Sequence, residues 1–270
     1  MRWEQLTDSD FARAVRETGL CIVPVGCLER HSDHLPLGTD MIAAHAVASR
    51  AAEREPAVVF PPYCFGQINE ARHFAGALTL PPPLLSQVLG AVCDEICRNG
   101  FRKILLYNGH GGNTHWLRYF CQCALYERKP YTVYLAQWPE DPERRARINA
   151  ICPPNGEHAH EEETCLMLAL APDLVKMDRV PDQPGVPLGR LKDLRGAYTG
   201  IWWYADYPEH YSGDARGANE EKARRILEIH VEALAETIHS IKKDRAAPAL
   251  EREFFDRVDK AGNPPGDSAG

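Results

Sequence analysis

Short apolar runs and longer amphipathic stretches alternate along the chain. Four apolar runs have the length of buried strands: 21–25, 57–60, 101–107 and 131–136. Stretches with helical periodicity lie between and after them: 41–53, 82–99, 114–128 and 220–242. This alternation predicts a mostly parallel sheet with helices on both faces. We therefore expect an α/β fold with a single three-layer domain over residues 1–243. A C-terminal tail over 244–270 mixes proline, glycine and charge, and we expect it to be loosely packed or to contact another subunit.

Composition narrows the class of protein. A chain of 270 residues with 44% apolar content can bury a sizeable core. Its net charge of -7 gives no general attraction to nucleic acid or to an anionic membrane. No apolar run approaches the roughly 18 residues of a membrane helix, and the first residues lack the pattern of a signal peptide. The nine cysteines have no zinc-ribbon spacing, so we expect buried free thiols and a cytoplasmic location.

The first candidate site follows the strand-like run 21–25. The segment 26–40 carries Glu29, His31 and Asp40. Residues at the carboxyl end of a parallel strand project into the crevice where open α/β sheets bind ligands. Carboxylates and an imidazole together suit Zn²⁺, Mn²⁺ or Fe²⁺. A polar loop with a hydrogen-bonded histidine is the alternative, and this segment alone leaves both interpretations open.

A second cluster favours the metal interpretation. The run 101–107 is followed directly by 108–113, in which three glycines surround His110. Glycines let the backbone turn sharply and approach a ligand closely. A glycine-rich phosphate loop is the alternative, but the spacing matches neither G-x-G-x-x-G nor the Walker pattern. We therefore favour a metal site.

A third cluster lies in 157–165 and opens an apolar-periodic helix. It contains two histidines and four glutamates. Acidic residues are expected in a first helical turn from the helix dipole alone. Two histidines among them are harder to explain in this way, and both His158 and Glu163 could reach a site at the helix start. The pattern is not H-E-x-x-H, so zincin chemistry is not implied.

Together the three clusters resemble the creatininase family of metal-dependent amidohydrolases. That family reads roughly Gly-Ser-x-Glu-Gln-His-Gly-x-His-Leu-Pro-Leu-Gly-Thr-Asp, then Asn-Gly-His-Gly-Gly-Asn, then His-Ala-Gly-Glu-x-Glu-Thr-Ser. Weaker matches follow at 74–80 and 213–216, so the resemblance runs from about Trp3 to Ile241. Spaced motifs in the right order are specific for the family. They do not select a substrate, because members of the family act on different compounds.

The resemblance implies four metal ligands, namely Glu29, His31, Asp40 and His110. Asp40 would bridge two divalent ions (Zn, Mn or Fe), with Glu29 and His110 on one ion and His31 on the other. Creatininases proper add a glutamate two residues after the match to His110, where this chain has Gly112. We expect Glu163 to complete the second site, because it matches the glutamate of the family's Glu-Thr-Ser element.

The resemblance also implies a reaction. His158 matches the family's histidine near the reacting carbonyl and would deliver a proton to the leaving nitrogen. A water bridging the two ions would be the nucleophile, because bound metal lowers its pKa. We expect hydrolysis of a small amide, with a cyclic one favoured, or of a related carbonyl compound. A cyclitol-type ketone or a formamide stays open, because other branches of the family use such substrates.

Creatinine itself is not the favoured substrate. Creatininases proper place aromatic residues ahead of the match to His158 and a tyrosine just after the match to His110. This chain has 153–155, which read Pro-Pro-Asn, and Gly111 at those places. A rival hypothesis is a nucleotide-binding α/β protein that uses 109–113 as a phosphate loop. It leaves the carboxylates and histidine of the first cluster unexplained.

Two further segments have candidate roles in the pocket. Asn69 and His73 lie where the family lines its substrate pocket, and a structural hydrogen-bonding role is the alternative for each. The segment 197–207 contains five aromatic residues, including Trp202 and Trp203. These could line the pocket or form a subunit contact, and we favour the contact. The resemblance implies a homo-oligomer, with a hexamer as one form, acting on a small molecule.

Overall fold

The sheet has four parallel strands. The computed structural model describes residues 1–137 and 141–262. In it the strands are β1 (Leu20–Val25), β2 (Val58–Val59), β3 (Lys103–Asn108) and β4 (Thr132–Ala136), in the order β2-β1-β3-β4. Every residue of β1 is buried, as expected for a central strand covered on both faces. The four strand-like runs were therefore predicted correctly, within one or two residues at most ends.

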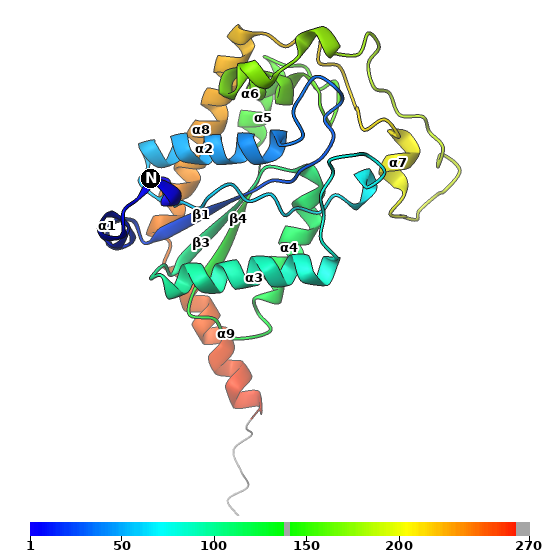
Figure 1. The fold of residues 1–270 in the computed structure, drawn as a ribbon. Helices are drawn as coiled ribbons and strands as arrows, with labels where there is room; N and C mark the ends of the chain where they lie inside the picture. Colours follow the sequence, from blue (N-terminus) through cyan, green and yellow to red (C-terminus); the bar gives the residue numbers. More distant parts are fainter. Residues whose placement is uncertain (138–140, 263–270) are drawn as a thin grey trace, which may run out of the picture.

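Helices cover both faces of this sheet (Figure 1). On one face lie α2 (Thr39–Arg54) and α8 (Glu220–Lys243), and on the other lie α1 (Asp8–Thr18), α3 (Pro82–Arg98) and α4 (Thr114–Cys123). Alternate residues of a strand point to opposite faces. Accordingly Ile22 packs in the cluster with α2 and α8, whereas Val23 packs in the cluster with α3 and α4. The expected three-layer α/β domain is confirmed.

The other elements build the region above the sheet. α5 (Pro142–Asn149) and α6 (Glu161–Leu170) pack against α8 around a third apolar cluster, and the short α7 (Trp202–Asp206) lies in a long irregular segment (Figure 1). Five 3₁₀ turns complete the described chain: η1 (Trp3–Gln5), η2 (Asn69–Ala71), η3 (Gly111–Asn113), η4 (Pro172–Leu174) and η5 (Met177–Arg179). No helix in the described ranges is long and apolar enough to cross a membrane.

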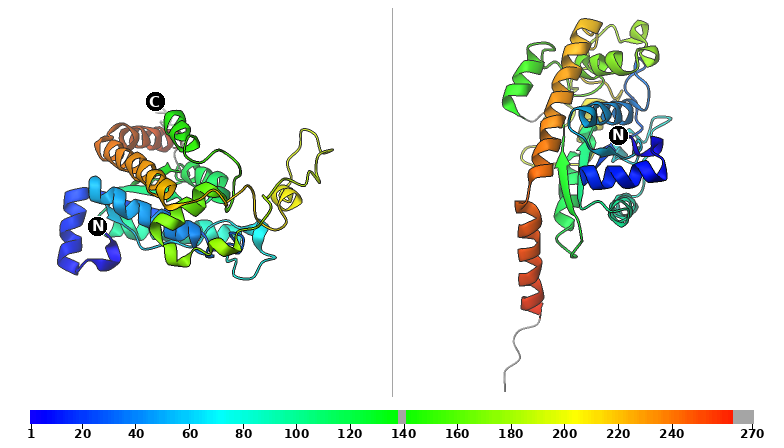
Figure 2. Two further views of the ribbon diagram at one scale, coloured as in Figure 1. Left: turned by 90° about the horizontal axis from the view of Figure 1, so that it is seen from above. Right: turned by 90° about the vertical axis from the view of Figure 1, so that its left-hand side faces the viewer.

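The C-terminal segment forms a helix, α9 (Ala246–Gly262), which extends away from the body of the molecule (Figure 2). Its first half contacts the edge of the sheet, where Thr132 donates a hydrogen bond of 2.5 Å to Glu251. Further along, Arg128 pairs with Asp256 at 2.8 Å. The part of the predicted tail over 263–270 lies outside the described residues.

Two expectations about local structure were wrong in part. The helix predicted over 114–128 ends at Cys123, because the next residues have little core to pack against and Tyr126 is 95% exposed. All nine cysteines are free, as expected. Six are buried, but Cys64 and Cys121 are half-buried and Cys123 is exposed. Cys121 and Cys123 lie in the last turn of α4, and Cys64 lies in the irregular stretch after β2.

Candidate metal centre

The candidate site lies where β1 and β3 end side by side. Val25 and Asn108 are paired in the parallel register, so the loops after both strands leave the same edge of the sheet. Gly26 allows the start of α2 to approach this edge, since a Cβ at Gly26 would lie 2.4 Å from the backbone nitrogen of Met41. The close approach brings Asp40, in the first turn of α2, beside the two loops.

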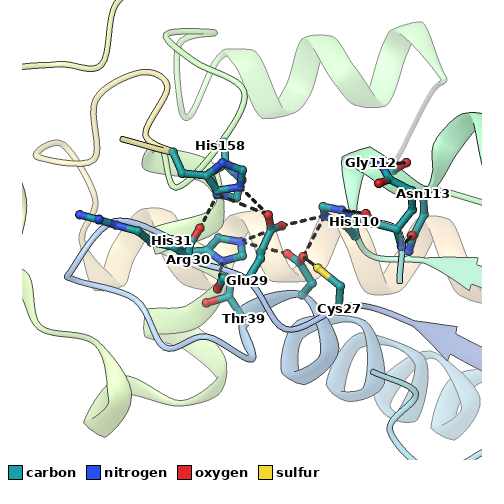
Figure 3. Close-up of polar contacts among 12 residues, drawn as sticks. Cys27, Glu29, Arg30, His31, Thr39, His110, Gly112, Asn113 and His158 are labelled. Carbon is teal, nitrogen blue, oxygen red and sulfur yellow. Dashed lines mark hydrogen bonds and ion pairs between the residues drawn. The ribbon is translucent and has the colours of Figure 1, made fainter. Parts of the chain in front are cut away.

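Asp40 lies between two histidines. Its Oδ2 is 3.0 Å from Nδ1 of His110, and its Oδ1 is 3.0 Å from Nε2 of His31. On the first side, Oε1 of Glu29 is also 2.8 Å from Nδ1 of His110. All four side chains are at most 5% exposed. The structure therefore brings the four residues predicted from the first two clusters into one buried group (Figure 3).

The hydrogen bonds of His110 determine which way its lone pair points. Its Nε2 lies 2.9 Å from the carbonyl oxygen of Gln67, which can only accept, so Nε2 carries a proton. Burial lowers the pKa of His110, but Cys27 and the carboxylates of Glu29 and Asp40 outweigh this and raise it well above its ordinary value. A bound metal would displace the Nδ1 proton, and in that neutral ring Nδ1 directs a lone pair toward Glu29 and Asp40. Among the described residues, Oε1 of Glu29 has no hydrogen-bond partner. Three buried acceptors converging in this way call for a cation between them, and the donor set fits a divalent metal.

Glu163 lies on the His31 side of the site. Possible ligand atoms of His31, His158 and Glu163 lie within 4.8 Å of one another. Burial opposes ionisation of Glu163. The interaction with His160, whose Nδ1 is 3.8 Å from Oε2 of Glu163, and the charge of His31 outweigh this effect and lower the pKa of Glu163 to about 2. Glu163 is thus an ionised carboxylate that faces a histidine.

The two neighbouring glutamates have other partners. Glu161 pairs with Lys222 of α8. Glu162 contacts Arg145 at 2.7 Å and His230 at 3.2 Å. Neither belongs to a group of possible metal ligands among the described residues.

His158 is positioned by the backbone of the first loop. Its Nε2 lies 2.8 Å from the carbonyl oxygen of Arg30, so this nitrogen carries the proton (Figure 3). Its ring lies 4.3 Å from the ring of His31, centroid to centroid. Burial is the main cause that lowers the pKa of His158 to about 4. The ring is therefore neutral at pH 7 and lies against the group of carboxylates.

Asn69 and His73 lie apart from the candidate metal ligands. Both line a cavity of about 570 Å³, together with Gln67, Glu70, Tyr198, Gly200, Ile201 and Tyr204. The cavity borders the metal site through Gln67, whose carbonyl oxygen accepts from His110. His73 also approaches the carbonyl oxygen of Pro208 at 3.1 Å. Trp202 is 41% exposed and Trp203 is buried, so the two differ in environment.

Two residues of the site were not predicted from the sequence. Cys27 donates from its Sγ to Oδ2 of Asp40 at 3.1 Å; it lies in the candidate segment 26–40, but no role was predicted for it. His210, 2% exposed, lies with its Nε2 2.6 Å from Oε2 of Glu29. His210 stands between a proline-containing turn and the match at 213–216, and no local pattern marks it as part of the site.

Residues 4–238 match the creatininase family, described as creatinine amidohydrolase. The chain belongs to the creatininase family. This membership favours the hydrolase over the nucleotide-binding alternative, and it makes the chain a hydrolase that acts on C–N bonds.

Three creatininase relatives differ in substrate. Creatinine amidohydrolase of Pseudomonas putida is 32% identical over 255 residues, covering 87% of this chain and 94% of the relative. Mycofactocin precursor peptide peptidase of Mycolicibacterium smegmatis is 28% identical over 235 residues, covering 84% and 87%. The 3-dehydro-scyllo-inosose hydrolase of Thermotoga maritima is 25% identical over 259 residues, covering 88% and 83%.

Solved creatininases share the fold. A manganese form superimposes with a TM-score of 0.76 at 27% identity, covering 90% of this chain and 99% of the other. A zinc-zinc type of a creatininase mutant gives 0.76 at 27%, covering 90% and 98%. The buried donor groups described above suit the same kind of ion, and the chain is a divalent-metal protein.

Proposed function

We propose that the chain is a dinuclear metal hydrolase of small amides. One observation carries the proposal: Asp40 presents one carboxylate oxygen to His110 and the other to His31, at 3.0 Å each. Two ions can share one carboxylate only if it lies between their two groups of ligands, as Asp40 does here. We assign Glu29, Asp40 and His110 to the first ion. His31, Asp40 and Glu163 are assigned to the second, with zinc or manganese favoured and iron open.

When bound, two such ions supply an activated water and a Lewis acid for the substrate carbonyl. The protein's own side chains hold and orient the groups that would bind these ions. Glu29 and Asp40 are buried, and the carbonyl oxygen of Gln67 keeps His110 in one tautomer. These groups keep a fixed geometry, so little reorganisation is needed at the moment of reaction.

His158 is our candidate for proton transfer. Its neutral ring carries the proton at Nε2, where the carbonyl oxygen of Arg30 holds it at 2.8 Å. We propose that Nε2 donates this proton to the leaving nitrogen of the substrate. When substrate binds, that nitrogen takes the place of the Arg30 carbonyl oxygen as the hydrogen-bond acceptor. Nδ1 would first take up the proton released by the attacking water, and Nε2 would then give its own proton to the leaving nitrogen, so the ring ends neutral and serves as both base and acid.

The cavity beside the metal site suits a small polar substrate. Gln67, Asn69, Glu70 and His73 offer hydrogen-bonding groups on one wall, while Tyr198 and Tyr204 offer aromatic rings. A cyclic amide uses both kinds of wall, through its polar edge and its flat face. A hydroxylated ring of the cyclitol-ketone type is the second candidate, because four polar side chains meet in this wall.

Assembly and compartment complete the proposal. We propose a cytoplasmic homo-oligomer. The nine free cysteines support a reducing compartment. Exposed apolar side chains support contact between copies; Trp202 on α7 is one, and Leu250 and Phe254 on α9 are others.

The test is a count of bound ions. Asp40→Ala should lose both ions, because a single carboxylate serves both, and activity on amides should disappear with them. Mass spectrometry of dialysed protein gives the ions per chain. Asp33→Ala is the control, since Asp33 lies in the same loop with a side chain that is 75% exposed. An Asp40 variant that keeps two ions and full turnover would contradict the shared assignment.

A further inference from the structure

His210 is a buried histidine that the proposed mechanism does not use. It lies four residues after α7 and is 2% exposed. Its backbone has a φ of 54°, a left-handed conformation that is uncommon for a residue with a side chain. Such conformations persist where the surroundings impose them, and they are frequent at functional sites.

The hydrogen bonds of His210 define its tautomer. The indole N–H of Trp203 is 2.9 Å from Nδ1 of His210. An indole nitrogen can only donate, so Nδ1 must accept and the neutral ring carries its proton at Nε2. That Nε2–H lies 2.6 Å from Oε2 of Glu29. The bonds form a directed chain from Trp203 through His210 to Glu29.

This direction excludes His210 as a metal ligand in the observed arrangement. His210, His158 and Glu29 do present possible ligand atoms within 4.8 Å of one another. However, one nitrogen of His210 has its lone pair engaged by Trp203, and the other carries a proton. The ring therefore has no lone pair left for an ion and acts on Glu29 instead.

The hydrogen bond from His210 determines which carboxylate oxygen of Glu29 remains available to bind an ion. Oε2 accepts from His210, whereas Oε1 is 2.8 Å from Nδ1 of His110 and has no hydrogen-bond partner among the described residues. A donor on one oxygen fixes the rotation of the carboxylate and turns the other toward His110. Partners of this kind commonly orient the ligands of metal sites.

The loop that carries His210 is itself held at several points. Ser212 exchanges backbone hydrogen bonds with His158, with N–O distances of 3.0 and 3.2 Å. Pro208 offers its carbonyl oxygen to His73 at 3.1 Å. The His210 ring packs against the His158 ring at 4.5 Å between centroids. The loop thus ties the pocket wall, the proton-transfer candidate and Glu29 together.

We propose that His210 is a positioning residue for the metal centre. It fixes Glu29 as a ligand through one oxygen, and the indole of Trp203 sets its tautomer. This inference rests on the proposed function only in that Glu29 holds an ion. It adds a dependence of metal binding on α7, the element next to the substrate cavity.

The experiment measures the affinity for Zn²⁺ by competition with a chelator and the visible spectrum of the Co²⁺-loaded protein. His210→Phe removes the donor and keeps a ring, so binding of the ion at Glu29 should weaken by about 10- to 100-fold. Trp203→Phe should weaken it by about tenfold, because the tautomer is no longer fixed. Trp202→Phe is the matched control and should bind like the parent.

His210→Gln separates positioning from ligation, because an amide N–H can still donate to Glu29. It should recover most of the affinity lost in His210→Phe and keep the parent Co²⁺ spectrum. Circular dichroism of the metal-free variants checks that each one folds. Parent-like affinity in His210→Phe, or an altered Co²⁺ spectrum in His210→Gln, would overturn the inference.

Failure of the proposed function would look different. A parent protein that binds one ion per chain contradicts the dinuclear assignment, while the His210 comparison still proceeds on the ion at Glu29. A parent that binds no Zn²⁺ overturns both. Two ions in the parent with no change in any variant overturns only the role of His210.

Discussion

His110 illustrates how a backbone carbonyl sets the chemistry of a buried side chain. The Gln67 carbonyl oxygen receives the Nε2 proton, so the lone pair at Nδ1 faces the two carboxylates. This contact depends on Gly112. A Cβ at Gly112 would lie 2.5 Å from Nε2 of His110 and 3.0 Å from the Gln67 oxygen. The glycine therefore leaves room for the hydrogen bond, and a glutamate there would disturb it.

Gly112→Ala should accordingly weaken metal binding by about 10- to 100-fold, because the methyl group displaces His110 from Gln67. Competition with a chelator measures the change. Gly111→Ala is the matched control, since a Cβ at Gly111 would meet nothing within 4 Å. Equal affinities in the two variants would show that the His110–Gln67 contact is dispensable.

At the scale of elements, the first turn of α6 shows why only one of three consecutive glutamates faces the site. Successive residues of a helix are about 100° apart around the axis. Glu161 therefore reaches Lys222 and Glu162 reaches Arg145, while Glu163 turns toward His31. The helix geometry thus places two of the three glutamates in salt bridges and the third in the crevice.

Glu163→Gln should leave about one tightly held ion per chain and little activity, because the second ion keeps only His31 and the shared Asp40. Glu162→Gln changes the same atoms one position earlier and should retain two ions. The ion count of dialysed protein checks both. Two ions in the Glu163 variant, or the same loss in the Glu162 variant, would refute the assignment.

The contact between α2 and α8 has a pH dependence of its own. Hydrogen bonds from Lys242 at 2.5 Å and His239 at 3.0 Å hold the pKa of Glu55 below its ordinary value. A carboxylate with a lowered folded pKa stabilises the fold above its unfolded pKa. This contribution is lost as pH falls through the folded pKa.

Glu55→Gln should therefore reduce the loss of unfolding free energy between pH 7 and pH 3, by a modest amount because the pair is partly exposed. Urea unfolding of metal-free protein at both pH values measures it. Glu53→Gln, an exposed carboxylate in the same turn, should keep the parent's dependence. A steeper dependence in the Glu55 variant would contradict the sign.

At the scale of the whole molecule, parallel topology assembles the site. β1 and β3 are adjacent and end at the same edge, so loops some eighty residues apart in sequence meet there. α2 and α6 then bring their first turns to this edge. Three carboxylates, Glu29, Asp40 and Glu163, end up in one buried region with histidines between them. Burying such charges is costly unless cations compensate them, which is the physical reason for a metal centre.

The local pattern of the chain was enough to predict the elements, and the family motifs were enough to select most of the candidate ligands. Period and length located the strands to within one or two residues at most ends, because a strand buried on both faces must be a continuous apolar run. Glu29, His31, Asp40 and His110 were predictable because they follow the ends of such strands in recognisable motifs. The end of α4 at Cys123 was not predictable from the sequence, because it depends on where the core ends.

The sequence by itself thus determined the α/β class, the family and the group of candidate ligands close to strand ends. Only the tertiary structure decided the partners that come from distant, motif-free segments. His210 reaches Glu29 across 181 positions, and Trp203 selects its tautomer. The carbonyl oxygens of Gln67 and Arg30 choose the protonated nitrogens of His110 and His158. Backbone carbonyls are present at every residue and leave no mark in a sequence, so their roles emerge only when the chain is folded.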